Sequence, residues 1–430
     1  MKPALRIAVA GLGTVGAGTV QLLQRQASLL ADRCGRRLDV VAVAARDHGR
    51  DRGFALDGIA WHDDPVAMAA APDIDVVVEV IGGAEGVARR VVETALAKGR
   101  HVVTANKALL AHHGTALARL AEERELTLAF EAAVAGGIPI IKGLREGLAA
   151  NRVTALHGIL NGTCNYILTE MRQTGRDFGE VLAEAQALGY AEADPSFDVD
   201  GVDAAHKLSV LTSVAFGTAV DFASVHIEGI RHISALDIRF AEELGYRIKL
   251  LGIARLTPQG VEQRVHPCMV PVETPLAVVD GVLNAVVATG DFVEKVLFEG
   301  RGAGGGPTAS AVVADLVDIA RERRVPCFTV PAARLEPGRA VPMERRTGAY
   351  YVRLMVRDQA GVLADVAAAL RDQGVSVESF LQHGRSPEDT VPVVLTTHDT
   401  DEAAMRRALD AIAGLGSVVE RPTMIRIETL

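Results

Sequence analysis

The chain has 430 residues, of which 49% are hydrophobic and 23% charged, and its formal net charge is −9 at pH 7. This length allows two or three domains with full hydrophobic cores, and the interspersed acidic residues argue against general nucleic-acid binding. No apolar run approaches the ~20 residues that span a bilayer, and the N-terminal segment lacks the features of a secretory signal. The four widely spaced cysteines form no CxxC pair, which predicts reduced thiols, no zinc site and a cytoplasmic location.

A glycine-rich turn follows the first apolar run of the chain. Residues 5–10 (LRIAVA) predict a strand buried on both faces, a helical pattern extends to about Leu30, and GLGTVG lies between them. In such a turn the first glycine permits a tight bend, the second lets the backbone approach a pyrophosphate, and the third lets the helix pack on the strand. We therefore predict that a dinucleotide contacts Gly11, Gly13, Thr14, Val15 and Gly16.

The end of the second predicted strand, residues 38–45, bears on the choice of dinucleotide. Arg46 and Asp47 follow it, at the position where an acid holds a ribose 2′-hydroxyl or an arginine accepts a 2′-phosphate. Arg46 favours NADP, whereas Asp47 keeps NAD possible. Arg50 and Arg52 beyond them support NADP, but they could equally belong to a solvated loop.

Further predicted strands at residues 75–80, 101–104 and 126–130 continue an alternating β/α array, which is typical of a Rossmann-type domain. Lys107 comes shortly after the second of these strands, on the side where open α/β sheets bind ligands. We predict that Lys107 contacts the nicotinamide or the substrate, the alternative being an ordinary surface lysine.

The segment after the strand at 126–130 passes through Glu131 and several small residues to Pro139. Its backbone cannot be regular throughout, so several carbonyl groups stay outside any strand pairing. Together with the Glu131 carboxylate, these carbonyls could bind a hard cation through oxygen alone. From the spacing alone, a plain loop is the favoured interpretation.

Residues 185–207 (AQALGYAEADPSFDVDGVDAAHK) are too polar and too rich in turns for a core element. Asp203 and Lys207 are four residues apart, so on a helix they share one face, and Glu192 precedes them on a loop. Carboxylates beside an ammonium group are what a site needs to hold a substrate's amino group while protonating an oxygen. A surface salt bridge is the alternative, but it leaves the acidic turn unexplained.

The middle of the chain predicts a second domain of strands and helices. Residues 153–160 predict a strand, Asn161 and Thr163 are predicted to be helix caps, and strand-like pieces follow the Lys207 helix. The stretch RGAGGGPT at 301–308 precedes a further helix. Its glycines predict an anion-accepting helix N-terminus, a close backbone approach or a flexible hinge.

The C-terminal part of the chain predicts a separate module. Residues 324–346 hold four prolines and mixed charges, which predicts a linker. Beyond it, residues 349–430 give the order βαββαβ, which is typical of a small ferredoxin-like module. The module carries no candidate catalytic cluster, so we interpret it as regulatory.

Taken together, these motifs resemble the homoserine dehydrogenase family over essentially the whole chain. The C-terminal module resembles an ACT domain, whose amino-acid-binding turn corresponds to DQAGVL at 358–363. The other matching stretches are GLGTVG at 11–16, TANK at 104–107, FEAAVAGGIPI at 130–140, NGTCNYIL at 161–168, the polar segment at 185–207 and GAGGGPTAS at 302–310.

The resemblance implies an NAD(P)-dependent enzyme that interconverts L-homoserine and L-aspartate 4-semialdehyde, in the route to threonine, methionine and isoleucine. It implies that Lys207 donates a proton to the aldehyde oxygen, and that Glu192 and Asp203 bind the amino-acid end of the substrate. Lys107 would line the cleft between cofactor and substrate. Gly189 and Gly304 would approach the cofactor.

The resemblance also implies ligands of other kinds. It implies a monovalent cation, sodium, held by Glu131 and the backbone carbonyls of Val134, Gly136 and Ile138. It implies a homo-oligomer and an amino-acid effector, threonine, bound near Gly361. The second strand ends in AARDHGR, which is longer than the usual turn of the family and leaves the choice between NADP and NAD open.

The predicted fold class is α/β, with four segments in chain order. Residues 1–140 form a Rossmann-type dinucleotide-binding domain, 141–306 an α+β catalytic and dimerisation domain, 324–346 the linker, and 347–430 the ACT module. Helix 307–323 is predicted to pack back on the first domain. Two alternative functions stay open: a dehydrogenase for another amino acid, since the dinucleotide motif does not specify the substrate, or an amino-acid sensor on an inactive dehydrogenase scaffold.

Overall fold

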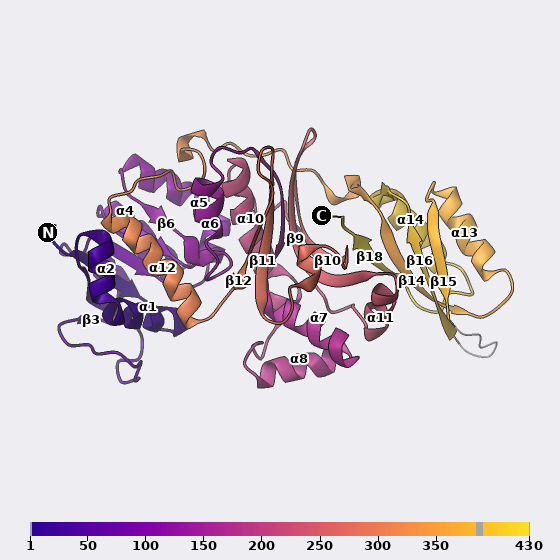
Figure 1. Cartoon of the computed structure of the whole chain (residues 1–430), viewed down its shortest axis with the longest axis horizontal. Coiled ribbons are helices and arrows are strands. Elements are labelled where there is room, and N and C mark those ends of the chain that lie inside the picture. Colours follow the sequence, from indigo (N-terminus) through magenta and orange to yellow (C-terminus); the bar gives the residue numbers. More distant parts are fainter. Residues whose placement is uncertain (1, 384–389, 430) are drawn as a thin grey trace.

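The structure is a computed structural model and describes residues 2–383 and 390–429. Three parts follow one another along the long axis of the molecule (Figure 1): a helix-covered N-terminal sheet, a central sheet, and C-terminal strands covered by helices α13 and α14. No helix of the described residues is long and apolar enough to cross a membrane.

The first sheet has six parallel strands in the order β3-β2-β1-β4-β5-β6. This is the strand order of a Rossmann-type fold, in which the order reverses between β1 and β4 and leaves a crevice at the carboxyl ends of the strands. The predicted fold class is therefore confirmed. Its elements are β1 (Leu5–Ala10), α1 (Thr14–Arg25), α2 (Ala27–Cys34), β2 (Leu38–Ala44), β3 (Ala60–His62), α3 (Pro65–Ala69), β4 (Val76–Glu79), α4 (Val87–Ala97), β5 (His101–Thr104), α5 (Lys107–Glu123) and β6 (Leu128–Ala129).

Helix α12 (Gly305–Ala320) lies against this first sheet, although it is far from it in sequence. Val312 and Leu316 of α12 are completely buried in the same core cluster as Ile7 of β1. The backbones of α1 and α12 come close at Gly18, where an added Cβ would lie 2.8 Å from the carbonyl oxygen of Gly305. The helix, orange in Figure 1, runs among the indigo N-terminal helices.

The second sheet has ten strands, nine of them in the order β12-β11-β7-β9-β10-β18-β14-β16-β15, with β8 paired to β10. Strand β12 was not predicted, because it lies at the sheet edge and most of its side chains are only partly buried or exposed, so its apolar pattern is weak. The strands and helices of the central part are α6 (Ile140–Lys142), a π-helical turn (Gly143–Gly147), β7 (Val153–Ile159), α7 (Gly162–Thr174), α8 (Phe178–Ala187), α9 (Ser196–Val199), α10 (Val202–Phe216), β8 (His226–Ile227), α11 (Ala235–Glu243), β9 (Tyr246–Thr257), β10 (Gly260–Pro271), β11 (Leu283–Gly290) and β12 (Glu294–Arg301).

The C-terminal strands follow the order β18-β14-β16-β15 with two helices, which confirms the predicted ferredoxin-like βαββαβ module. Its sheet does not end at β18, because β18 pairs in parallel with β10 through Cys268↔Arg426 and Met269↔Ile427. The pairing covers an edge that would otherwise be open to other chains. The elements are β13 (Thr347–Gly348), β14 (Tyr350–Arg357), α13 (Val362–Asp372), β15 (Val377–Gln382), β16 (Thr390–Thr397), β17 (Thr400–Asp401), α14 (Glu402–Ala413) and β18 (Thr423–Ile427).

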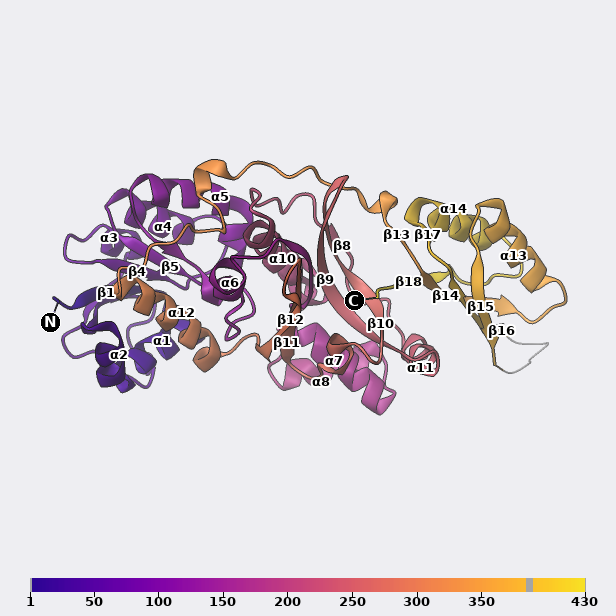
Figure 2. The same ribbon diagram turned by 45° about the horizontal axis from the view of Figure 1, so that its top comes forward.

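The segment between α12 and β13 runs from the first sheet across the top of the central sheet to the C-terminal strands, as the two views show (Figures 1 and 2). It contains two short 3-10 turns, Ala332–Arg334 and Met343–Arg345. The exact division of the chain into domains stays a prediction.

Candidate active site

Helix α10 places two of the predicted residues, Asp203 and Lys207, one turn apart. Gly201 has a left-handed φ of 85°, which ends the preceding turn and lets the helix begin at Val202. Asp203 lies in the first turn, where the helix dipole favours a negative charge. The two side chains are nearly fully buried, with 3% and 9% of their residues' surface exposed. A solvated surface bridge therefore does not describe this pair.

Asp203 lies between two lysines. Its Oδ2 is 2.7 Å from Nζ of Lys207, and its Oδ1 is 2.9 Å from Nζ of Lys107, at the start of α5. Lys207 also donates a hydrogen bond of 2.7 Å to the carbonyl of Leu160, at the end of β7. The structure thus brings together residues from the two sheets. Lys107 lies 96 positions from Asp203 in the sequence, so their contact could not be read from residue spacing.

Three polar residues without a predicted functional role complete this cluster. Asn161 caps α7 as predicted, since its Oδ1 accepts from the backbone N–H of Cys164 at 2.8 Å, but its Nδ2 also donates to Asp198 and Asp203, both at 2.8 Å. Asn284, from β11, donates to the carbonyl of Leu160 at 3.1 Å. Asn284 had no local signal in the sequence, whereas Asp198 belongs to the polar segment that carried the resemblance.

Charge and burial set the two lysines apart. Burial alone would raise the pKa of Asp203, but the charges of Lys207 and Lys107 and the hydrogen bonds from Lys207 and Asn161 hold that pKa well below its ordinary value. Burial lowers the pKa of Lys207, and Asp203 offsets this only in part. Burial would also lower the pKa of Lys107, but the charge of Asp203 and their hydrogen bond raise it above its ordinary value. Lys207 is therefore the better proton donor, and Lys107 stays cationic.

These residues line a cavity of about 410 Å³ at the junction of the two sheets. Gly189 and Gly304 line the same cavity, together with Lys107, Asp198, Asp203 and Lys207. Glu192 is not among its lining residues: its side chain is exposed on the loop after α8, although its charge acts on Lys107. The volume suits a small substrate.

The glycine-rich turn after β1 borders a second cavity of about 610 Å³, lined by Gly11, Gly13 and Arg46 among others. Gly11 has a φ of 98°, and a Cβ on Gly16 would lie 1.9 Å from the carbonyl oxygen of Gly11. Both positions therefore require glycine. No side chain caps α1, so its first N–H groups are free to face an anion. Thr14, Val15 and Gly16 form this first turn.

The second glycine-rich turn lies beside the first. An added Cβ on Gly305 would lie 3.2 Å from the carbonyl oxygen of Thr14, so the N-termini of α1 and α12 begin close together. Of the three predicted explanations for the glycines at 301–308, the close backbone approach is the one observed.

Three family models match the chain in succession. Residues 11–131 match the NAD-binding domain of homoserine dehydrogenase, 139–317 homoserine dehydrogenase itself, and 350–416 the ACT domain. The homoserine dehydrogenases of Pseudomonas aeruginosa and Neisseria gonorrhoeae are 47% and 46% identical to the chain, and each alignment covers 100% of both proteins. The chain belongs to the homoserine dehydrogenase family. It is accordingly an NAD(P)-dependent oxidoreductase with a C-terminal ACT domain, as the motifs predicted.

Solved homoserine dehydrogenases agree with this assignment. The crystal structure of a homoserine dehydrogenase from Thiobacillus denitrificans matches with a TM-score of 0.94 and 46% identity, covering 100% of this chain and 99% of that one. A hyperthermophilic archaeal homoserine dehydrogenase in complex with NADPH matches with a TM-score of 0.65 and 25% identity, covering 75% of this chain and 99% of that one.

The predicted cation site lies where three carboxylates face two basic side chains, Lys142 and Arg323. Glu131 is buried, its carboxylate oxygens accept from the backbone N–H groups of Ile141 and Lys142 at 2.9 Å each, and its own N–H donates to Asp315. Burial raises the pKa of Glu131 to about 7, and the charge of Asp315 adds to the rise. Lys142 Nζ lies 3.1 Å from Asp315 and 2.5 Å from Asp318. Arg323 also lies 3.7 Å from Asp318, so Asp315 and Asp318 both have basic partners, and a cation beside Glu131 would offset the charge of that carboxylate.

Most of the oxygen atoms that could bind a cation in this region are backbone carbonyl oxygens. Within residues 2–383 and 390–429, no group of three or more His, Cys, Asp and Glu side chains is arranged to hold a metal ion. A cation beside Glu131 would therefore depend on carbonyl oxygens, which suits a hard ion. The three predicted carbonyl donors, Val134, Gly136 and Ile138, lie in the irregular stretch between Ala133 and Ile140.

Proposed function

We propose that the protein interconverts L-homoserine and L-aspartate 4-semialdehyde, a step in the formation of threonine, methionine and isoleucine. The observation that supports this substrate is the buried Lys207–Asp203–Lys107 cluster in a small cavity next to the nucleotide turn. The test is a spectrophotometric assay of nicotinamide reduction with L-homoserine, using L-aspartate as the comparison. Turnover of aspartate without turnover of homoserine would refute the proposal.

In the proposed mechanism the bound nicotinamide supplies the hydride chemistry. Lys207 gives a proton to the aldehyde oxygen in one direction and removes it from the hydroxyl in the other, and its lowered pKa brings it nearer to the range in which an amine can do both. Asp203 holds Lys207 in place through its Oδ2. The substrate's ammonium contacts the other oxygen of Asp203, Oδ1, and competes for it with Lys107. Glu192, exposed on the loop after α8 and outside the cavity, supplies a second carboxylate to that ammonium once the loop moves toward it.

We propose NADP as the preferred cofactor, because Arg46 lines the nucleotide cavity at the end of β2, where a 2′-phosphate would lie. Replacing Arg46 by alanine should lower kcat/KM with NADP by about tenfold or more, since a charge-assisted hydrogen bond is lost, and should change the value with NAD much less. Steady-state assays with both cofactors measure the ratio of kcat/KM with NADP to kcat/KM with NAD. An unchanged NADP-to-NAD ratio would remove Arg46 from this role.

We propose sodium as the cation at Glu131, with the carbonyls of Val134, Gly136 and Ile138. The raised pKa of Glu131, about 7, means that its neutral form favours folding and that this stability is lost as pH rises through 7. Sodium should offset the loss, so NaCl should raise Tm over N-methylglucamine chloride by about 2 °C or more at pH 8 and by less at pH 6. Thermal unfolding of the wild type and of Glu131→Gln tests this. An equal sodium effect in the variant would contradict the assignment.

We propose that an amino acid, with threonine as the first candidate, acts at the turn before α13. Gly361 has a φ of 97° there and no side chain caps α13, so the start of this helix is suited to a carboxylate. Gly361→Val is strained in this conformation and should abolish inhibition by threonine, measured relative to the variant's own uninhibited rate. Equal fractional inhibition of wild type and variant would disprove the role of this turn.

We also propose a cytoplasmic homo-oligomer. The hairpin between β11 and β12 exposes 86% of Phe292, 36% of Val293 and 41% of Leu297, an apolar set that a second copy of the chain could cover. Sedimentation velocity on the purified protein reports the assembly state.

A further inference from the structure

Glu79 is a completely buried glutamate at the carboxyl end of β4. Both oxygens of its carboxylate accept hydrogen bonds. Oε1 accepts from the backbone N–H groups of Ile81 and Gly82 at 2.8 and 3.1 Å, and Oε2 accepts from the hydroxyl of Thr104 at 2.6 Å. A carboxylate offers acceptors on both of its oxygens, whereas an amide offers an acceptor on one side only. The three donors therefore fit a glutamate at this position and not a glutamine.

Thr104 continues this chain of hydrogen bonds toward α5. It is the last residue of β5, it is completely buried, and it pairs in register with Glu79. Its hydroxyl also accepts from the backbone N–H of Asn106 at 3.0 Å. The side chain of Asn106 donates to the carbonyl of Gly83 at 2.8 Å and, through its oxygen, caps the N-terminus of α5. The chain thus ends directly before Lys107, the first residue of that helix.

The turn at residues 80–83 borders the nucleotide cavity. Val80 and Ile81 line this cavity, and the backbone of Val80 lies against the glycine-rich turn, because a Cβ on Gly11 would lie 2.8 Å from the carbonyl oxygen of Val80. The two glycines of the turn have left-handed φ angles of 91° and 87°, and the turn belongs to no helix or strand. Its place therefore depends on the hydrogen bonds that lead to Glu79.

These contacts join the cofactor side of the site to its substrate side. One end of the chain is the turn at 80–83, and the other is the start of α5, where Lys107 lies 2.9 Å from Asp203 and lines the Lys207 cavity. Lys207 itself is held by partners on α10 and at the end of β7, outside this chain. Loss of the Glu79 contacts should therefore disturb ligand binding more than proton transfer.

We propose that Glu79 is a positioning residue for the reaction, which holds the cofactor-facing turn at 80–83 and Lys107 in one fixed arrangement through Thr104 and Asn106. Glu79 lines neither cavity, so it acts through these residues. Its role toward Lys107 rests on the proposed homoserine dehydrogenase reaction, whereas its role toward the turn concerns the binding of the nicotinamide dinucleotide alone.

Replacement of Glu79 by glutamine tests this role with little change of volume. One orientation of the amide leaves the hydroxyl of Thr104 without an acceptor, and the other points an NH2 group at the N–H groups of the turn. Fluorescence titration of the full-length protein with NADPH and with NADH measures cofactor binding without turnover. For the cofactor that binds the wild type more tightly, the dissociation constant should rise by about tenfold or more, since a charge-assisted hydrogen bond is lost.

A loss of stability alone gives a different result. A smaller folded fraction lowers the apparent kcat but leaves KM and the dissociation constant of the cofactor unchanged. The matched control is Glu122→Gln on α5, because Glu122 also accepts two backbone N–H groups, from Cys327 at 2.9 Å and Ala332 at 2.6 Å, and lines neither cavity. This variant should have a lower Tm and bind the cofactor as the wild type does.

Thr104 offers a conservative pair of variants that decides the question even if Glu79→Gln does not fold. Thr104→Val keeps the volume and removes the hydroxyl, so it should weaken cofactor binding as Glu79→Gln does. Thr104→Ser keeps the hydroxyl and should bind as the wild type does. The proposal is overturned if Glu79→Gln or Thr104→Val binds the cofactor normally, if Thr104→Ser binds as weakly as Thr104→Val, or if Glu122→Gln weakens binding equally.

The link to Lys107 has its own measurement. At saturating cofactor, Glu79→Gln should raise KM for homoserine by about tenfold and keep kcat within about threefold of the wild type. In a Lys107→Met background it should add little to KM, because residues that act as one unit have non-additive effects. Full additivity would overturn this link. If the wild type does not oxidise homoserine, the proposed reaction fails, while the cofactor titration still decides the role of Glu79.

Discussion

Replacing Lys207 by alanine is expected to lower kcat for homoserine oxidation by ~10²-fold or more. Lys207 is the lysine whose pKa burial lowers, and in the proposed mechanism it exchanges a proton with the substrate oxygen. The fold should survive, because Asp203 keeps Lys107 at 2.9 Å and Asn161 at 2.8 Å as partners. Steady-state kinetics with circular dichroism on the same preparation measures both properties.

The control for this experiment is a second buried lysine. Lys249 of β9 lies 3.1 Å from Asp280 and donates to the carbonyl of Val279, but it is outside the Lys207 cavity. Lys249→Met should destabilise the protein while keeping kcat near normal at temperatures where it is folded. Lys207→Met keeps most of the side-chain volume and should lose activity like the alanine variant. Near-normal kcat in both Lys207 variants would exclude Lys207 as the proton donor.

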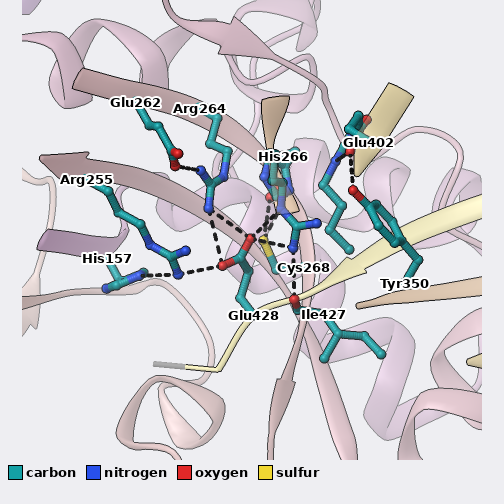
Figure 3. A network of polar contacts seen from close by, with 12 residues as sticks. His157, Arg255, Glu262, Arg264, His266, Cys268, Tyr350, Glu402, Ile427 and Glu428 are labelled. Atoms are coloured by element: carbon teal, nitrogen blue, oxygen red, sulfur yellow. Dashed lines mark hydrogen bonds and ion pairs between the residues drawn. The ribbon is translucent and has the colours of Figure 1, made fainter. Parts of the chain in front are cut away.

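The second large effect is expected from Glu428, at the junction of the central sheet and the ACT module. Its carboxylate lies 3.1 Å from Arg264, 2.9 Å from Arg346 and 2.8 Å from Arg255, and only 2% of its side chain is exposed. Figure 3 shows the dashed contacts from Arg255 and Arg264 converging on Glu428. Glu428→Gln should reduce the free energy of unfolding by about 3 kcal/mol or more, because it leaves the buried guanidinium of Arg346 without its counter-charge and removes one of the two carboxylates that Arg264 contacts.

Denaturant unfolding at pH 7 measures this loss, with Glu420→Gln as a control at an exposed glutamate of the same module. Burial would raise the pKa of Glu428, but Arg264, Arg346 and Arg255 hold it well below the ordinary 4.5. The stability from this group is therefore present above pH 4.5 and lost as pH falls through the lower pKa of the folded protein. The difference between wild type and Glu428→Gln should shrink below pH 4.5. A difference below 1 kcal/mol at pH 7 would show that the network contributes little.

The N-terminal fold could be predicted because its signals are local. The apolar run before Gly11 and the helical pattern after it define one β/α unit without any distant contact. The pair Asp203 and Lys207 could be predicted for the same reason, since a helix places residues four apart on one face. Strand β12 could not be predicted, because an edge strand needs little apolar surface.

The parts that could not be predicted depend on residues far apart in the sequence. Lys107 and Asp203 were each expected near a ligand, but nothing local indicates that they contact each other. Asn161 was predicted as a cap, and its contact with Asp203 follows only from the placement of the N-terminus of α7 next to the first turn of α10. β18 pairs with β10 through only two residue pairs, and so short a pairing leaves no pattern in the sequence. The ACT module was therefore predicted as a separate unit, although its sheet continues into the central sheet.

The return of α12 to the first sheet also bears on how the protein is made. The core that packs one face of this sheet includes Val312, Leu316 and Ile319 together with residues of β1. During synthesis the chain emerges from its N-terminus, so the chain must leave the ribosome as far as the end of α12, at Ala320, before this layer can close. Until then the apolar surface of β1 and α1 that α12 covers stays exposed on the nascent chain.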